Sequence, residues 1–324
     1  MRYVARRFFH ATLLLCVISF ACFALAQIAP GDFFDALRLN PRISSETVDH
    51  LRSEYGVDRP LLVRYGHWLH SVLEGQMGFS IAYGGPVAPL LRVRARNTLL
   101  LTATSTLLAW LIAVPVGVWC AARRGTRVDR VVGFAATTIL TFPDLLIFLL
   151  LLLLAVRTGW FPAGGMESLA TENMESWARI LDLARHLFLP ALGLSIVTLP
   201  MLFRHVRSTV GEAMTAPFMR VARGHGIPQA RLLFRFALPV AINPLISLFG
   251  LSVATMLSAS LLAEVVMSWP GLGPLFLEAI LSRDVYIVAG VVVLSSVFLV
   301  AGNLFADLLI FAVDPRIRVG RQDA

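Results

Sequence analysis

The chain contains no lysine, since all 28 of its basic residues are arginine. A P-loop needs a lysine to reach the nucleotide phosphates, so the sequence excludes such an ATPase site, and it excludes lysine Schiff-base chemistry as well. Charged residues make up only 15% of the 324 residues, and the mean hydropathy is +0.75, which is far too apolar for a soluble domain of this length. The three cysteines lie in or beside apolar runs without metal-ligand spacing, so neither a metal site nor a disulfide framework is predicted.

The apolar residues gather in six runs, each near the roughly 20 residues that a bilayer-spanning helix needs. The runs cover residues 9–29, 98–119, 131–156, 187–206, 240–263 and 286–312. The first run follows three arginines, as a signal peptide would, but it is longer than a typical signal core, and we interpret it as a retained helix. We therefore predict an all-α polytopic membrane protein with six transmembrane helices.

The arginines are distributed unevenly between the two sides of these spans. The N-terminus and residues 120–130, 204–239 and 313–324 hold 16 arginines against 4 acidic residues, while the rest holds 12 arginines against 16. The positive-inside rule then places both termini in the cytoplasm. The arginines at 92, 94 and 96 fall on the outer side, where we expect a short interfacial helix. Orientation alone explains the basic charge, so no nucleic-acid partner is predicted.

This topology predicts four regions along the chain. They are a cytoplasmic start with the first helix at 1–29, an extracytoplasmic segment at 30–97, a five-helix transmembrane core at 98–312 and a cytoplasmic tail at 313–324. The core includes a cytoplasmic loop at 207–239. Within the outer segment, Ser44–Tyr55 and Leu61–Leu73 have a helical pattern.

The most informative stretch lies in that cytoplasmic loop, between two uncharged runs. A helix-compatible segment meets Gly224 and Gly226, which break a helix at low cost, and Pro228 suits the start of another. In the second segment the apolar residues Leu232, Leu233 and Phe236 share one side, and Arg231 and Arg235 share another. The pattern predicts a helix, a glycine turn and a short amphipathic helix, suited to docking.

Polar residues inside the spans are candidates for a solute path, because such residues are costly in lipid. Asp144 follows Pro143 in the third run and could either line a path or cap a kink. Asn303 and Asp307 share a face of the sixth run, where hydrogen bonding between helices is favoured over solute contact. Glu264 ends the fifth run, where we expect it to reach water. His67 and His70 lack the carboxylate of a zinc-protease pattern, and no catalytic motif is found.

The loop, with its EA…RVARGHGI…LP…NP pattern, resembles the "EAA" loop of permease subunits of ABC importers. Further strings resemble the B-type permease of the dipeptide, oligopeptide and nickel group. They are GVDRPLLVRYGHWL (56–69), GQMGFSI (75–81), RNTLLLTATS (96–105), AEVVMSWPGLGPLF (263–276) and NLFADLLIFAVDPRIR (303–318). Together they extend along nearly the whole chain.

The resemblance implies a non-catalytic subunit that pairs with a second homologous permease, two ATPase subunits and an extracytoplasmic substrate-binding protein, within membrane lipid. ATP and Mg would be held by the partner ATPases, with no cofactor on this chain. The coupling-loop residues that it implies are Glu212, Ala213, Arg220, Ala222, Arg223, Gly226, Ile227, Arg231, Leu232 and Arg235. Among them, Ile227 and Leu232 would anchor the loop through apolar contacts, and the charged residues would form a polar rim. Gly224, His225 and Pro228 depart from the family's usual small residue, lysine and polar helix starter.

Two other classes of function remain as alternatives. An ATP-independent channel or ion-coupled carrier could use Asp144 and Asp307 as a charged relay. An intramembrane enzyme lacks any paired catalytic residues in this sequence. The resemblance favours an importer of peptides or similar small solutes, and the sequence does not specify which solute.

Overall fold

The computed structural model describes residues 2–28, 60–80, 82–168 and 175–313, with isolated positions between 38 and 50. These residues are almost entirely helical, as predicted, and include one small antiparallel sheet that pairs β1 (Phe79–Ser80) with β2 (Gly85–Pro86). The chain forms two compact units, residues 1–98 with 270–300 and residues 99–269 with 301–324. Two long helices, α5 (Val87–Ala122) and α13 (Val285–Val313), contribute residues to both units.

The first unit is built around aromatic packing between α1 (Arg2–Ile28) and α4 (Leu61–Leu73). The predicted helix at 61–73 is therefore confirmed with the same bounds. Trp68 of α4 is buried against Phe23 of α1, and its Nε1 donates a hydrogen bond to the Met77 carbonyl oxygen at 3.2 Å. The Tyr65 hydroxyl donates to the Cys16 carbonyl oxygen at 3.1 Å. These contacts fasten α4 along α1.

Segments far apart in the sequence meet in the rest of this unit. Ser80 donates a hydrogen bond to the Asp284 carboxylate at 2.6 Å, and the Asn97 amide donates to the Pro270 carbonyl oxygen at 2.8 Å. The turn around Pro270 leads into the short apolar helix α12 (Leu272–Leu281). Partial burial raises the pKa of Tyr83 to about 12, and Glu278 of α12, which accepts a hydrogen bond from its hydroxyl, acts in the same direction. Tyr83 therefore stays a neutral donor to α12 at ordinary pH.

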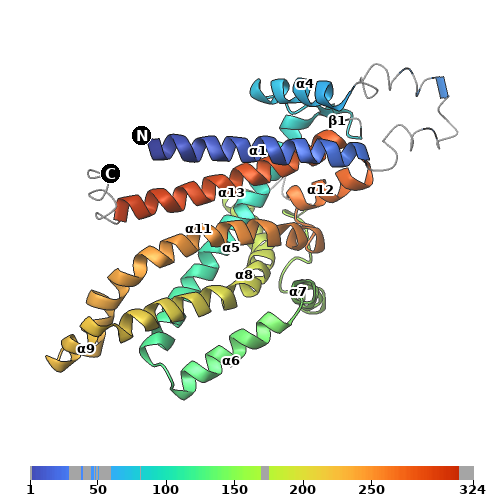
Figure 1. The fold of residues 1–324 in the computed structure, drawn as a ribbon. Coiled ribbons are helices and arrows are strands. Elements are labelled where there is room, and N and C mark those ends of the chain that lie inside the picture. The colour runs from blue at the N-terminus through green and yellow to red at the C-terminus, as the bar shows by residue number, and fades with distance from the viewer. Residues whose placement is uncertain are drawn as a thin grey trace. The chain divides into compact units, whose positions relative to one another are not determined.

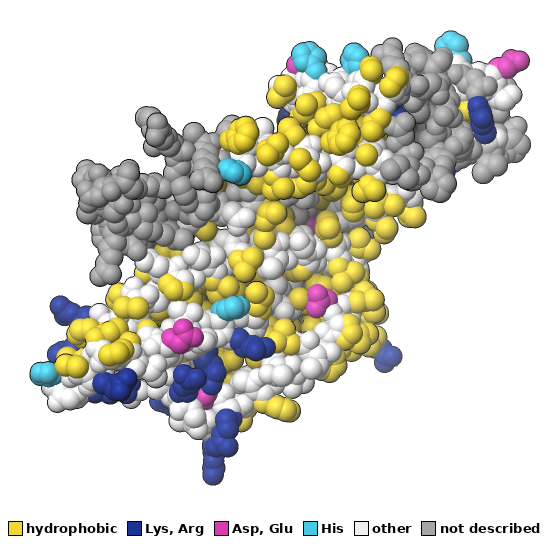
Figure 2. Space-filling view, viewed as in Figure 1, with side chains coloured by type: hydrophobic (Ala, Val, Ile, Leu, Met, Phe, Trp, Pro, Cys, Tyr) yellow, Lys and Arg dark blue, Asp and Glu magenta, His cyan; other side chains and the backbone are white. Residues whose placement is uncertain are grey.

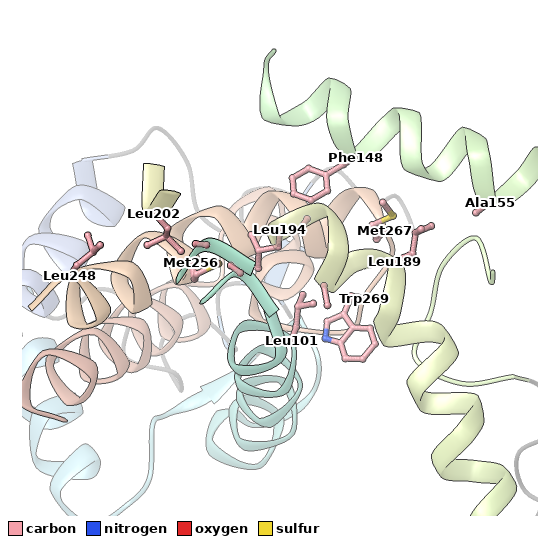
Figure 3. Close-up of a cluster of buried hydrophobic side chains, with 14 residues drawn as sticks. Leu101, Phe148, Ala155, Leu189, Leu194, Leu202, Leu248, Met256, Met267 and Trp269 are labelled. Carbon is pink, nitrogen blue, oxygen red and sulfur yellow. The ribbon is translucent and has the colours of Figure 1, made fainter. Parts of the chain in front are cut away.

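The second unit holds the remaining helices around one apolar cluster. Its helices are α6 (Arg127–Thr141), α7 (Asp144–Thr158), α8 (Ser176–Thr215), α9 (Pro217–Gly224), α10 (Gln229–Leu232), the π-helix η2 (Leu233–Ala237) and α11 (Leu238–Val266). In Figure 1, α8 and α11 run side by side toward α9. Figure 3 shows buried side chains of the cluster between these helices, with Leu101 beside Trp269. Helix packing around a shared core thus defines this unit.

The six predicted spans are reproduced only in part. Four helices are long and apolar enough to cross a membrane, and a fifth span results if α6 and α7 are joined. The first predicted run, 9–29, falls almost entirely within α1, a helix of 27 residues whose side chains are described only in part. The run at 131–156 forms two helices, α6 and α7, which meet at a 97° bend where the sequence predicted a kink at Pro143. Pro143 explains the break, since it lacks an N–H donor and forces Phe142 into an extended conformation.

A close approach of two helices in the second unit gives a stability prediction. A Cβ added to Gly250 of α11 would lie 2.6 Å from the Ala306 Cβ of α13, and neither group can move aside. We expect Gly250→Ala to destabilise the protein by about 1–3 kcal/mol through overpacking. A Cβ added to Gly133 of α6 would have no atom within 4 Å, so Gly133→Ala should be neutral or stabilising. Thermal melting of the detergent-purified variants checks this, and equal melting temperatures would contradict the packing.

Candidate functional site

The candidate site is the coupling knuckle, which we define as residues 212–239. Its first helix, α9, begins at Pro217 after the extended residue Ala216, and it ends at Gly224. Gly226 then adopts a left-handed conformation with φ of +74°, and its N–H bonds to the Arg223 carbonyl oxygen at 2.9 Å. A Cβ on Gly226 would meet nothing within 4 Å, so backbone conformation rather than space favours glycine there. The predicted glycine turn is thus confirmed.

The second helix of the knuckle differs from the prediction in how it ends. Pro228 precedes α10, but α10 continues through the π-helix η2 directly into α11 without a break. The Leu238 N–H bonds to the Leu233 carbonyl oxygen, five residues back. Pro239 explains the wider turn, because its ring would clash with the Arg235 carbonyl and it has no N–H to donate. The knuckle is therefore joined rigidly to a membrane-length helix.

An apolar core lies beneath the knuckle. Met219, Leu232 and Leu233 are buried, and they pack with Val118 of α5 and Val206 of α8. Ala222 and Ile227 are half-buried at the edge of the same cluster, and Ala213 is buried in it. Leu232 is only 1% exposed, so it anchors the knuckle to the protein's own helices. Because this core joins the knuckle to α5, α8 and α11, we expect these helices to move together with the knuckle.

The charged residues of the predicted rim all lie at the surface. Glu212, Arg220, Arg223, Arg231 and Arg235 are exposed. Arg223 donates a hydrogen bond to the Met214 carbonyl oxygen at 3.2 Å, and Glu212 accepts one from Ser208 at 2.8 Å. Figure 2 shows dark blue side chains gathered at the end of the second unit that carries α9 and the start of α6. The knuckle thus presents an arginine-rich surface over an apolar base.

The turn between α5 and α6 makes two contacts that we did not predict, one with the knuckle and one with α8, the helix that leads into it. Gln229 donates a hydrogen bond to the Ala122 carbonyl oxygen at 2.7 Å, at the end of α5. Arg207 of α8 holds Asp129 of α6 through two hydrogen bonds of 2.5 and 2.7 Å, and Asp129 is 3% exposed. Thr126 accepts a hydrogen bond from the Asp129 N–H. The sequence signal was present, since Asp129 is the only acid in the basic segment 120–130 and stands three residues after a capping threonine.

The polar residues predicted within the spans are not brought together as one site. Asp144 is the first residue of α7 and is exposed at the bend, where the helix N-terminus favours its charge. Glu264 is fully buried near the end of α11, which corrects the expectation that it reaches water. Asn303 is exposed on α13, and the side chain of Asp307 lies outside the described residues.

Two family models match the chain. Residues 113–319 match the model described as "Binding-protein-dependent transport system inner membrane component". Residues 1–102 match the model of the N-terminal part of such membrane components. Together the matches extend over most of the chain.

Individual proteins resemble the chain over nearly their full length. The oligopeptide transport system permease protein AppB of Bacillus subtilis is 36% identical, with 97% of this chain and 98% of the relative covered. OppB of Mycobacterium tuberculosis, an oligopeptide permease, and GsiC of Salmonella choleraesuis, a glutathione permease, are each 29% identical, with 98% of this chain and 99% of the relative covered.

A solved structure also shares the fold. A chain of the MetNI methionine ABC transporter, in an inward-facing conformation, matches with a TM-score of 0.57 at 18% identity, covering 69% of this chain and 96% of that chain. The predicted resemblance is confirmed, and the alternatives of a channel, carrier or enzyme are not favoured. The chain belongs to the family of binding-protein-dependent transport system inner membrane components, and it is a permease subunit of an ABC importer.

Proposed function

We propose that this permease forms half of the translocation pathway of a peptide importer and that the coupling knuckle docks onto a separate ATPase. One observation carries the coupling role: the knuckle has an exposed arginine rim, while its base is packed into α5, α8 and α11. A push on the rim therefore moves three long helices together. The relatives named as oligopeptide permeases support peptides as the substrate class.

The complete assembly would contain a second homologous permease, two ATPases and an extracytoplasmic binding protein. ATP and Mg would be bound by the ATPases, since this sequence has no lysine for a P-loop. The polar residues Asp144, Glu264, Asn303 and Asp307 remain candidates for the path or for contacts between helices. In this assembly ATP binding would close the ATPases and rock the helices between inward- and outward-facing states.

The arrangement of arginines supports a cytoplasmic location for the knuckle. The basic segments 120–130 and 204–239 are distant in sequence, but the Gln229–Ala122 and Arg207–Asp129 contacts hold them at the same end of the second unit. A single arginine-rich end is what the positive-inside rule expects of the cytoplasmic face. We accordingly place both termini in the cytoplasm and the protein in the bacterial inner membrane.

Reconstitution tests this function. The permease, co-expressed with a second permease, an ATPase and a binding protein from the same organism, would be placed in proteoliposomes with internal ATP. We expect ATP-dependent uptake of labelled di- to pentapeptides, abolished when ATP is replaced by ADP. Uptake that persists with ADP would overturn the ATP-driven importer mechanism. Uptake of glutathione without uptake of longer peptides would overturn the expectation that the substrates extend from di- to pentapeptides.

A further inference from the structure

We propose that the turn between α5 and α6 carries a binding site for the headgroup of an anionic phospholipid. The site, called here the arginine turn, consists of Arg123, Arg127 and Arg130 with the aromatic residues Trp119 and Phe134. The inference rests on the proposed cytoplasmic orientation of this end of the second unit. None of these five residues belongs to the knuckle.

The positive charge of the arginine turn is not neutralised within the protein. Arg123, Arg127 and Arg130 are exposed, and none of them forms an ion pair within the described ranges. The one acid of the segment, Asp129, is buried and has both carboxylate oxygens occupied by Arg207, while the Gly125 N–H also donates to it at 2.9 Å. Three guanidinium groups are therefore available to an external anion.

Aromatic side chains lie beside these arginines, between the charged turn and the apolar parts of α5 and α6. Trp119 is 44% exposed on α5, and the Arg123 guanidinium lies 5.3 Å from the centre of its ring. Phe134 on α6 is 75% exposed, one turn beyond Arg130. Both helices continue from this end into apolar sequence, so the surface passes from charge through aromatic rings to hydrocarbon-facing residues. Tryptophan and arginine occupy such interfacial positions because each has an apolar body and a polar tip.

The chemistry of the site selects a phosphodiester attached to acyl chains. Guanidinium groups bind phosphate oxygens through paired hydrogen bonds, which a compact ammonium group does not reproduce. The exposed Trp119 and Phe134 would contact the glycerol and upper acyl chains, a contribution that a free phosphate cannot obtain. Each arginine near an anionic lipid surface contributes roughly fivefold in affinity, so three contribute on the order of 100-fold.

The test is lipid binding by the purified transporter complex, followed by native mass spectrometry during titration with phosphatidylglycerol or phosphatidylcholine. We expect the wild type to prefer phosphatidylglycerol, and the R123Q/R127Q/R130Q variant to lose about 100-fold in apparent affinity for it. Binding of phosphatidylcholine should be unchanged. The matched control R157Q/R179Q/R185Q removes three arginines from the other end of the same unit and should retain the preference.

Three results would overturn the proposal. The first is unchanged affinity for phosphatidylglycerol in the R123Q/R127Q/R130Q variant. The second is loss of the ATPase subunit from that variant with lipid affinity intact, which would assign the arginines to a protein interface. The third is displacement of phosphatidylglycerol by equimolar glycerol phosphate, which would show a site for soluble anions. Peptide uptake is measured on the same preparation, so failure of the proposed transport function is seen separately from failure of lipid binding.

Discussion

Replacing Gly226 with valine is expected to abolish most ATP-driven uptake while leaving the permease in the membrane. Gly226 has φ of +74°, a conformation that a β-branched residue adopts only at a cost of about 1–3 kcal/mol. A strain of that size would reduce the population of the correctly shaped turn by roughly 5- to 150-fold. The measurement is uptake and ATP hydrolysis in proteoliposomes, and we expect hydrolysis to continue at a higher ratio to uptake.

The neighbouring Gly224 provides a matched control. It ends α9 with an ordinary backbone conformation, and a Cβ there would also meet no atom within 4 Å. Gly224→Val should therefore retain near-normal uptake. Equal loss in both variants would mean that any added bulk at the rim blocks docking. Unchanged uptake in Gly226→Val would contradict the role of the turn.

Removing the Asp129 carboxylate is expected to loosen the link between the α5–α6 turn and α8, the helix that leads into the knuckle. Asp129→Ala leaves the Arg207 guanidinium without its two hydrogen bonds. Since the Arg207 side chain is 33% exposed, water compensates in part, and we expect a loss of about 1–3 kcal/mol rather than the full value of a buried pair. Uptake should fall along with the thermal stability of the second unit.

A double-mutant cycle separates the ion pair from general damage. The coupling energy between Asp129→Ala and Arg207→Ala should be about 1–3 kcal/mol, so the second substitution adds little to the first. Arg204→Ala, one turn away on α8 at an exposed position, is the control and should add independently to Asp129→Ala. Fully additive effects of Asp129→Ala and Arg207→Ala would show that the pair does not join the turn to α8.

Local signals in the sequence were sufficient for much of the knuckle. Glycine and proline set the turn at 224–228, and the spacing of Leu232, Leu233 and Arg231 correctly separated its buried and exposed sides. The helix at 61–73 followed from its periodicity alone. These features depend on neighbours within a few residues, which is why a single sequence could predict them.

Features that depend on distant residues were missed or misplaced. The Arg207–Asp129 pair joins residues 78 positions apart, and nothing in either local pattern specifies the other partner. Glu264 was expected at the surface because it ends an apolar run, but packing buries it completely. Tertiary packing, which the sequence pattern does not encode locally, decided both. The bend in the third run was different, because Pro143 marked its position in the sequence, and only its angle of 97° was not predicted.

Cysteine cross-linking between the knuckle and the ATPase tests the central claim most directly. Arg220→Cys introduces a thiol on the exposed surface of α9, and Arg157→Cys introduces one at the end of α7, in the other half of the second unit. In membranes containing the assembled transporter, the account predicts a cross-link from position 220 to the ATPase and none from position 157. A cross-link from position 157 with none from position 220 would contradict both the docking role of the knuckle and the proposed orientation.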